Sequence, residues 1–174
     1  MLSKKLEKAL NDQMRLEAYA SYLYLSMASW FDNAGMEGCS KFMFRQSVEE
    51  NEHMLRIYHY ILEMDGKAIV PGIKQAPNKF KNARDIFKSV YAHEQKVTKS
   101  INDLVNLSSK EAHHATFNFL QWYVAEQMEE EALMRGILDR IKLIGNGPQS
   151  LYYIDKEIEK INQAEIAKEG AENA

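Results

Sequence analysis

Apolar residues recur along this chain at alternating steps of four and three, the spacing that places side chains along one side of an α-helix. The first row of this kind runs from Leu6 to Phe31. Ser3 is suited to cap the start of the helix, and Asn33 to Gly35 supplies a stop. The pattern therefore predicts a first long helix that begins near residue 3.

A second row runs from Cys39 to Met64, and Asp65-Gly66 ends it. Residues 65–81 carry no such row and contain two prolines and two glycines, which indicates a loop. A helix of about 28 residues is about 42 Å long. An extended segment of this loop's length reaches up to about 56 Å. We therefore expect the loop to run the whole length of a helical bundle.

Asn82 is placed to cap a third helix, whose row covers residues 83–104. The fourth row covers residues 116–141. A capping-box pattern at residues 108–111 is expected to open this helix, and Gly145 to Pro148 to stop it. Short connections make neighbouring helices antiparallel, whereas the long one lets the second and third helices run parallel.

These features predict one all-α domain over residues 1–174, a four-helix bundle with one long crossover, occupying about residues 3–145. A short fifth helix is expected at about residues 149–162, packed on its own bundle or on a partner chain. The remaining polar tail, to residue 174, is expected to be frayed or disordered.

Each of the four apolar rows is interrupted by polar residues near its middle. The interruptions are Glu17, Glu50 with His53, Glu94, and Gln127 with Glu130. In a bundle of this topology the four midpoints lie in one layer. Buried carboxylates cost several kcal/mol each unless they are compensated, and the rows contain no Lys or Arg at these positions. Bound cations are the simplest explanation, and a hydrogen-bonded network of protonated acids is the alternative.

Oxygen-rich ligation with one imidazole suits Fe(II) or Mn(II), whereas a closed Cys and His site suits Zn(II). We divide the ligands into a first metal site of Glu17, Glu50 and His53, and a second of Glu94, Glu130 and the nearby Gln127. Glu50 is placed to bridge the two. A symmetric di-iron bundle carries Glu-x-x-His on two helices, and this chain carries it once. The second metal should therefore be held more weakly, which suits iron that passes through.

In several stretches the chain resembles the prokaryotic non-haem ferritins of the ferritin-like di-iron superfamily. These stretches are Gln13 to Glu17, Glu49 to His53, His93 to Gln95, Phe117 to Gln127, and Leu151 to Glu157. The resemblance implies a homo-oligomeric hollow shell of twenty-four subunits. Such a shell oxidises Fe(II) with dioxygen or hydrogen peroxide at an intrasubunit dinuclear centre and stores ferric mineral inside. The resemblance assigns iron to the same six residues that interrupt the rows.

The resemblance also implies a third iron site, facing the cavity, with ligands at Glu49, Glu126, Glu129 and Glu130. A solvated acidic face is the alternative for the first three of these. Tyr24 would lie near the di-iron centre, where it could hydrogen-bond or donate an electron, or it is simply a core residue. Haem is not expected, because Glu52 stands where the related bacterioferritins carry a haem-binding Met. The other histidines, His93 among them, are expected on the surface.

Composition narrows the remaining choices. The net charge of −3 argues against nucleic acid as a partner, and the single Cys39 excludes an internal disulfide framework. No apolar stretch is long enough to cross a bilayer, so we expect a cytoplasmic protein with no membrane partner. Two rival functions stay open: a di-iron oxidase or peroxidase that retains its metals, and a helical interaction protein without metal chemistry.

Overall fold

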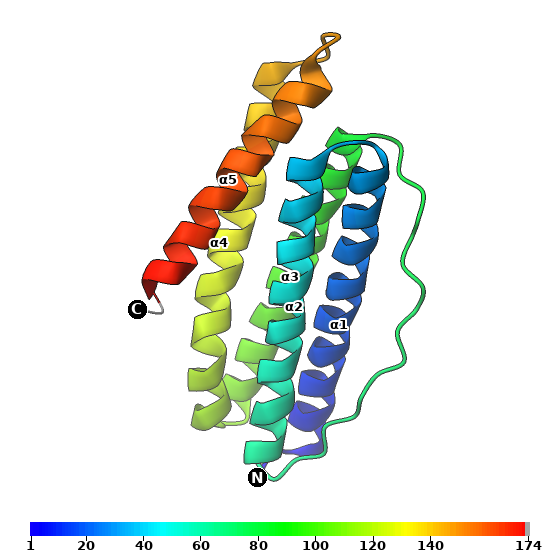
Figure 1. Ribbon diagram of the computed structural model, residues 1–174. Helices are drawn as coiled ribbons and strands as arrows, with labels where there is room; N and C mark the ends of the chain where they lie inside the picture. Colours follow the sequence, from blue (N-terminus) through cyan, green and yellow to red (C-terminus); the bar gives the residue numbers. More distant parts are fainter. Residues whose placement is uncertain (173–174) are drawn as a thin grey trace.

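Five helices form the chain in the computed structural model, which describes residues 1–172 (Figure 1). They are α1 (Lys4–Asn33), α2 (Glu37–Glu63), α3 (Ala83–Lys110), α4 (His114–Ile144) and α5 (Ser150–Glu172). Helices α1 and α2 are antiparallel, as are α3 and α4, and α2 and α3 run in the same direction. The predicted four-helix bundle with one long crossover is confirmed. No helix in the described range is long and apolar enough to span a membrane.

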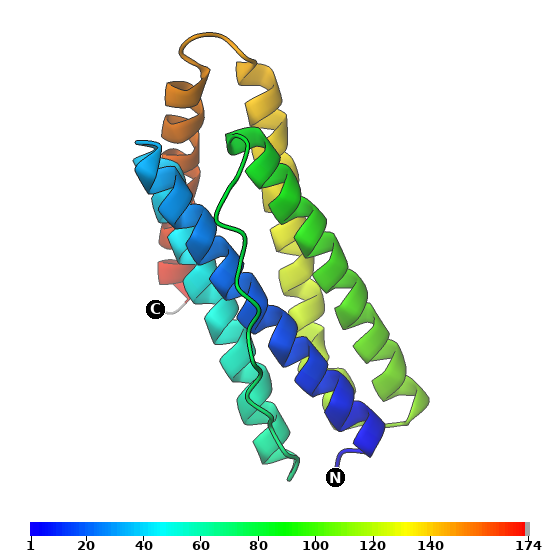
Figure 2. The same cartoon turned by 90° about the vertical axis from the view of Figure 1, so that its right-hand side faces the viewer.

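The crossover between α2 and α3 follows α1 from one end of the bundle to the other (Figure 2). Near its start, the Lys67 and Ile69 amides donate to Glu7 Oε2 at 2.9 Å and to Asn11 Oδ1 at 2.6 Å. Near its end, Ser26 Oγ donates to the Pro77 carbonyl at 2.6 Å. Side chains of α1 therefore fix this segment, which has no regular structure of its own.

The interior consists of two hydrophobic clusters with a polar layer between them. The first cluster contains residues of α1 from Ala20 onwards and residues from the beginnings of α2 and α3. The second cluster contains residues from the opposite ends of those helices. Because the rows on all four helices change cluster at their polar break, the breaks lie at one level. The predicted layer of polar residues therefore exists.

A pair of serines joins α1 and α2 next to this layer. Ser21 Oγ donates to the Ser47 carbonyl at 2.7 Å, and Ser47 Oγ donates to the Ser21 carbonyl at the same distance. Both residues are buried. The two backbones approach closely here because each side chain is small and uses its hydroxyl on the opposite main chain.

Two of the predicted helix starts are confirmed and one is wrong. Ser3 Oγ accepts from the Leu6 amide at 3.0 Å, and Asn82 Oδ1 accepts from the Asp85 amide at 2.9 Å. The pattern at residues 108–111 does not open α4, because α3 continues to Lys110 and Ser108 Oγ donates to the Val105 carbonyl within it. Helix α4 begins after His113, whose Nδ1 accepts from the Thr116 amide.

Helix α5 folds back onto its own bundle and contacts α2 and α4. Its end was predicted wrongly: the helix continues to Glu172 instead of stopping near residue 162. The segment after residue 162 has no proline and is rich in Ala and Glu, which both favour helix. The expected fraying from Asn162 is also wrong, since Asn162 is buried and its Oδ1 accepts from Arg45 Nε at 3.0 Å. The last two residues of the predicted tail lie outside the described range.

The first turn of α2 receives its cap from α5. Met36, the N-cap residue, makes no side-chain cap bond, and Asp155 Oδ1 accepts from the Cys39 amide at 2.9 Å instead. A Cβ atom on Gly38 would lie only 2.4 Å from the Asp155 carbonyl oxygen. Glycine at this position therefore allows α5 to pack closely against the first turn of α2.

We expect Gly38→Ala to displace α5 and to destabilise the chain by about 1–3 kcal/mol, the usual cost of overpacking. The matched control is Gly136→Ala in α4, where an added Cβ meets no atom within 4 Å. That control should stabilise the helix by roughly 0.5–1 kcal/mol, because Ala is the better helix former. Chemical unfolding curves of both variants measure the difference, and equal curves would contradict the close α2–α5 contact.

Candidate metal centre

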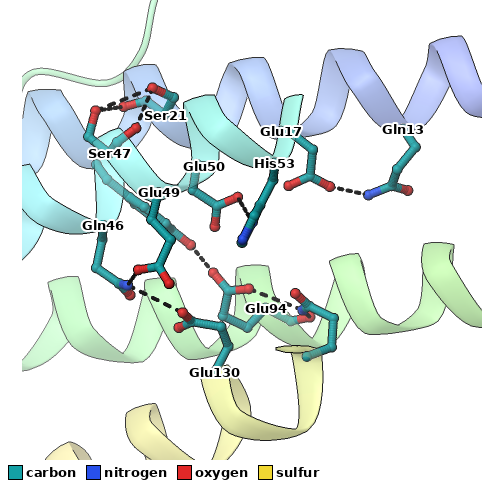
Figure 3. A network of polar contacts seen from close by, with 12 residues as sticks. Gln13, Glu17, Ser21, Gln46, Ser47, Glu49, Glu50, His53, Glu94 and Glu130 are labelled. Atoms are coloured by element: carbon teal, nitrogen blue, oxygen red, sulfur yellow. Dashed lines mark hydrogen bonds and ion pairs between the residues drawn. The ribbon is translucent and has the colours of Figure 1, made fainter. Parts of the chain in front are cut away.

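The six residues that interrupt the apolar rows all lie in the polar layer. Each is buried, with Glu17 and Glu94 fully inaccessible to solvent. They come from the four helices of the bundle, and the labelled carboxylates from α1 to α4 point toward a common centre (Figure 3). The structure therefore brings together the residues that the sequence suggested for a dinuclear site.

Glu17, Glu50 and His53 form the tightest group. Each offers a ligand atom, and these atoms all lie within 4.8 Å of one another. Glu17 Oε2, Glu50 Oε2 and His53 Nδ1 are buried without a hydrogen-bond partner in the described chain. Buried polar atoms normally find partners, and leaving one without costs about 1–3 kcal/mol. Glu50 Oε2 and His53 Nδ1 lie 3.4 Å from each other. Buried ligand atoms without hydrogen bonds on two facing helices are what a divalent cation requires.

The second group is already hydrogen-bonded. Tyr24 Oη donates to Glu94 Oε1, and Gln127 Nε2 donates to Glu94 Oε2 at 3.2 Å. Glu130 Oε1 accepts from Gln46 Nε2 at 3.3 Å, whereas Glu130 Oε2 is buried and has no partner within residues 1–172. A cation here would compete with the hydrogen bonds of Glu94, which agrees with a weaker second site.

Three carboxyl groups of this layer, those of Glu50, Glu94 and Glu130, favour the protonated state in the absence of a cation. Burial, followed by the charges of Glu17 and Glu94, holds the pKa of Glu50 well above its usual range. Burial, followed by the charge of Glu49, does the same to the pKa of Glu130. Burial raises the pKa of Glu94 to about 7, although the Tyr24 hydroxyl opposes the shift. A bound cation would reverse this balance, because it stabilises the ionised form of each ligand.

Tyr24 is fully buried beside this layer and touches it through Glu94. Burial, and then the Glu94 charge, hold the pKa of its phenol well above 10. The expectation that His93 lies on the surface is wrong. Its ring packs against Tyr19 and Tyr24, with centroids 6.3 and 5.9 Å apart, and its Nε2 is buried. His93 is off the apolar row, but α1 covers that side of α3.

Trp122 adjoins the first group. Its ring stacks on Tyr123, with centroids 4.2 Å apart, and lies 5.5 Å from the His53 ring. The Arg56 guanidinium covers it at 3.7 Å from the ring centroid. The Trp122 and Tyr123 rings therefore pack against His53. Tyr123 lies on the fourth apolar row, whereas Trp122 and Arg56 lie off the rows.

An acidic cleft of about 300 Å³ opens on the outer side of the layer. It contains all four residues expected for a third site, namely Glu49, Glu126, Glu129 and Glu130. Glu49, His53 and Glu126 also offer ligand atoms within 4.8 Å of one another. Glu129 lies farther out and is exposed. The cleft therefore adjoins the dinuclear group through His53 and Glu130.

Several polar neighbours of the site were missed by the sequence analysis. Gln46 interrupts the second row as the acids do, and that position was its signal. Arg45 Nη1 donates to Glu49 Oε2 at 2.9 Å, and it sits one residue off the row. Glu165 and Lys168, which also line the cleft, belong to the segment that was expected to be disordered.

A family model described as the ferritin-like domain matches residues 7–144. The chain belongs to the ferritin family. It is 46% identical over 161 residues to a bacterial non-heme ferritin of Campylobacter jejuni, covering 92% of this chain and 96% of that protein. Identity to a bacterial non-heme ferritin of Escherichia coli O157:H7 is 36% over 162 residues, covering 93% and 98% of the two chains.

Solved structures agree with this assignment. An open pore ferritin from Archaeoglobus fulgidus superimposes with a TM-score of 0.88 at 41% identity, over 91% of this chain and 96% of that one. The resemblance inferred from the sequence motifs is therefore confirmed. The match to the family model ends at the last residue of α4, and α5 follows it.

Replacing Glu94 by Gln in the metal-free ferritin chain tests whether burial raises the pKa of this carboxyl group. Because the pKa of Glu94 is raised from 4.5 to about 7, the folded state favours the protonated carboxyl and loses stability as pH rises between these values. Gln cannot ionise. Relative to the wild type, the variant should therefore gain roughly 3 kcal/mol between about pH 4.5 and about pH 8.

Urea unfolding of the two metal-free proteins at stepped pH measures this gain. Glu52→Gln removes an exposed carboxylate of α2 and serves as the matched control. A stability difference between Glu94→Gln and wild type that does not vary with pH would contradict the raised pKa.

Proposed function

We propose that this chain stores iron and oxidises Fe(II) to Fe(III) at an intrasubunit dinuclear centre. Membership of the ferritin family supports iron storage. The observation that carries the oxidation step is the group of Glu17, Glu50 and His53, each of which offers a buried ligand atom that lies close to the others and has no hydrogen-bond partner in the described chain. A protonated network is a poorer account of the layer, because it leaves the buried Glu130 Oε2 without a hydrogen-bond partner among the described residues.

In this proposal two Fe(II) ions are the substrate. Glu17, Glu50 and His53 bind one, Glu94 and Glu130 bind the other with Gln127 beside it, and Glu50 is shared. Each ion gives up one electron. Dioxygen takes the two electrons and two protons to become hydrogen peroxide, or peroxide takes them to become two waters. Fe(III) is the harder cation, so a carboxylate-rich site favours the oxidised product.

The protonation states of the carboxyl groups support this chemistry. Glu50, Glu94 and Glu130 have raised pKa values in the metal-free chain, so protons leave them when iron binds. Those protons are released beside the oxidant that consumes them. Tyr24, through its hydrogen bond to Glu94, is placed to orient that ligand and to supply an electron.

Oxidised iron then leaves the second site first, because Tyr24 and Gln127 compete with the iron for the oxygens of Glu94. The acidic cleft of Glu49, Glu126 and Glu129 offers the next carboxylates and serves as a third iron site. Mineral grows in a hollow homo-oligomeric shell, for which the resemblance implies twenty-four subunits. Large apolar side chains exposed on α1, α2 and the crossover support association, among them Tyr22, Leu25, Leu55, Leu62, Ile69 and Val70.

His53→Ala should slow Fe(II) oxidation more than about ten-fold while assembly stays intact, because it removes a direct ligand and even outer partners of ligands matter that much. Stopped-flow absorbance of the ferric product and gel filtration measure the two properties. His59→Ala, an exposed change on the same helix, is the control. Unchanged oxidation kinetics in His53→Ala would overturn the assignment.

Iron retention separates storage from the rival oxidase. We would add excess Fe(II) to metal-free protein in air, desalt it and count soluble iron per chain. Storage predicts iron far beyond what the ligand groups can hold. About two per chain, the capacity of one dinuclear site, would indicate a di-iron oxidase or peroxidase that retains its metals. No retained iron would favour the protonated network.

A further inference from the structure

The last turns of α5 place a positive charge in the acidic cleft. Lys168 forms an ion pair with Glu129, and Glu165 lines the same cleft three residues earlier in the helix. This part of α5 lies beyond the point where the apolar row of the helix ends. Its position in the cleft therefore calls for an account other than core packing.

The cleft has an open coordination position besides its acidic lining. Glu130 is only 5% exposed, and its Oε2 has no hydrogen-bond partner among the described residues although it borders the cleft. The dinuclear group lies directly behind it. A cation that reaches Glu126 or Glu129 thus meets a buried carboxylate oxygen that no group among the described residues satisfies.

Two cationic side chains line the cleft, and they are held differently. Arg45 has a side chain only 14% exposed, and it donates to Glu49 at 2.9 Å and to Asn162 at 3.0 Å. The side chain of Lys168 is 48% exposed and that of its partner Glu129 is 61% exposed. Exposed ion pairs are weak and are screened by salt. Of the two cations, Lys168 is the one that another cation can displace.

We propose that Lys168 is a built-in competitor for the cation site of the cleft. A divalent cation that binds at Glu126 and Glu129 must break the Lys168–Glu129 pair and then tolerates the ammonium nearby. Lys168 thereby lowers the affinity of the cleft and keeps metal there in transit. The inference rests on the proposed function in one respect, that the cleft is a cation site.

Zn(II) is a suitable probe because it has no redox chemistry. Calorimetric titration of the assembled metal-free protein, at neutral pH and low salt, resolves its binding classes. The class that disappears in Glu126→Gln is the cleft. In Lys168→Gln this class should bind Zn(II) about two- to five-fold more tightly, the range expected for loss of one exposed ion pair. The gain should shrink at high salt.

Lys160→Gln is the matched control. It removes the same charge from an exposed position of α5 that does not line the cleft, eight residues or about 12 Å along the helix. Lys168→Arg keeps the charge and should retain the wild-type affinity. In a Glu129→Gln background the Lys168→Gln substitution should add no more than the control does, because the pair no longer exists.

An affinity change in Lys168→Gln no larger than in Lys160→Gln would overturn the inference. So would an equal change in the Glu129→Gln background, which would indicate a general charge effect. If Glu126→Gln removes no Zn(II) class, the cleft is not a cation site, and the proposed third site fails with the inference. Oxidation at the dinuclear centre is tested separately by His53→Ala, so failure of one proposal can be told from failure of the other.

Discussion

The burial of four carboxyl groups in one layer is the constraint on which this structure depends. Glu17, Glu50, Glu94 and Glu130 come from four different helices and meet in a layer from which solvent is excluded. A bundle built for stability alone would fill this level with apolar side chains, because burying such groups is generally costly. The two hydrophobic clusters on either side hold the layer together. Their packing stabilises the bundle enough for it to contain an energetically costly polar layer when no cation is bound.

The site is also asymmetric, and the asymmetry follows from hydrogen bonding. Glu17, Glu50 and His53 each keep a ligand atom without a hydrogen-bond partner in the described chain, whereas both oxygens of Glu94 accept hydrogen bonds, from Tyr24 and Gln127. In the second group only Glu130 Oε2 lacks a partner among the described residues, so fewer ligand atoms are open there than in the first group. A gradient of this kind, continued into the more exposed cleft, suits a protein through which metal moves in one direction.

Much of the fold and of the candidate site could be predicted from the sequence, because the same spacing of residues indicated both. Steps of four and three gave the helices, and residues that broke the rows, such as Glu17 and Glu94, marked the layer. That they act as ligands stays a prediction, although the structure brings them together. Other features depend on contacts between different helices, which the spacing of residues along one helix does not reveal. Burial of His93 depends on how α1 lies across α3, and the end of α5 depends on partners such as Arg45 that are distant in sequence.

The serine pair between α1 and α2 has a consequence for the geometry of the layer. Ser21 and Ser47 lie about one helical turn from Glu17 and Glu50, and each hydroxyl bonds to the opposite main chain. A bulkier side chain at either position would wedge the helices apart at the level of these two carboxylates. The separation of α1 and α2 at the level of Glu17 and Glu50 is thus limited by two small side chains. Neither serine belongs to the candidate ligand group, yet both affect the spacing of two of its members.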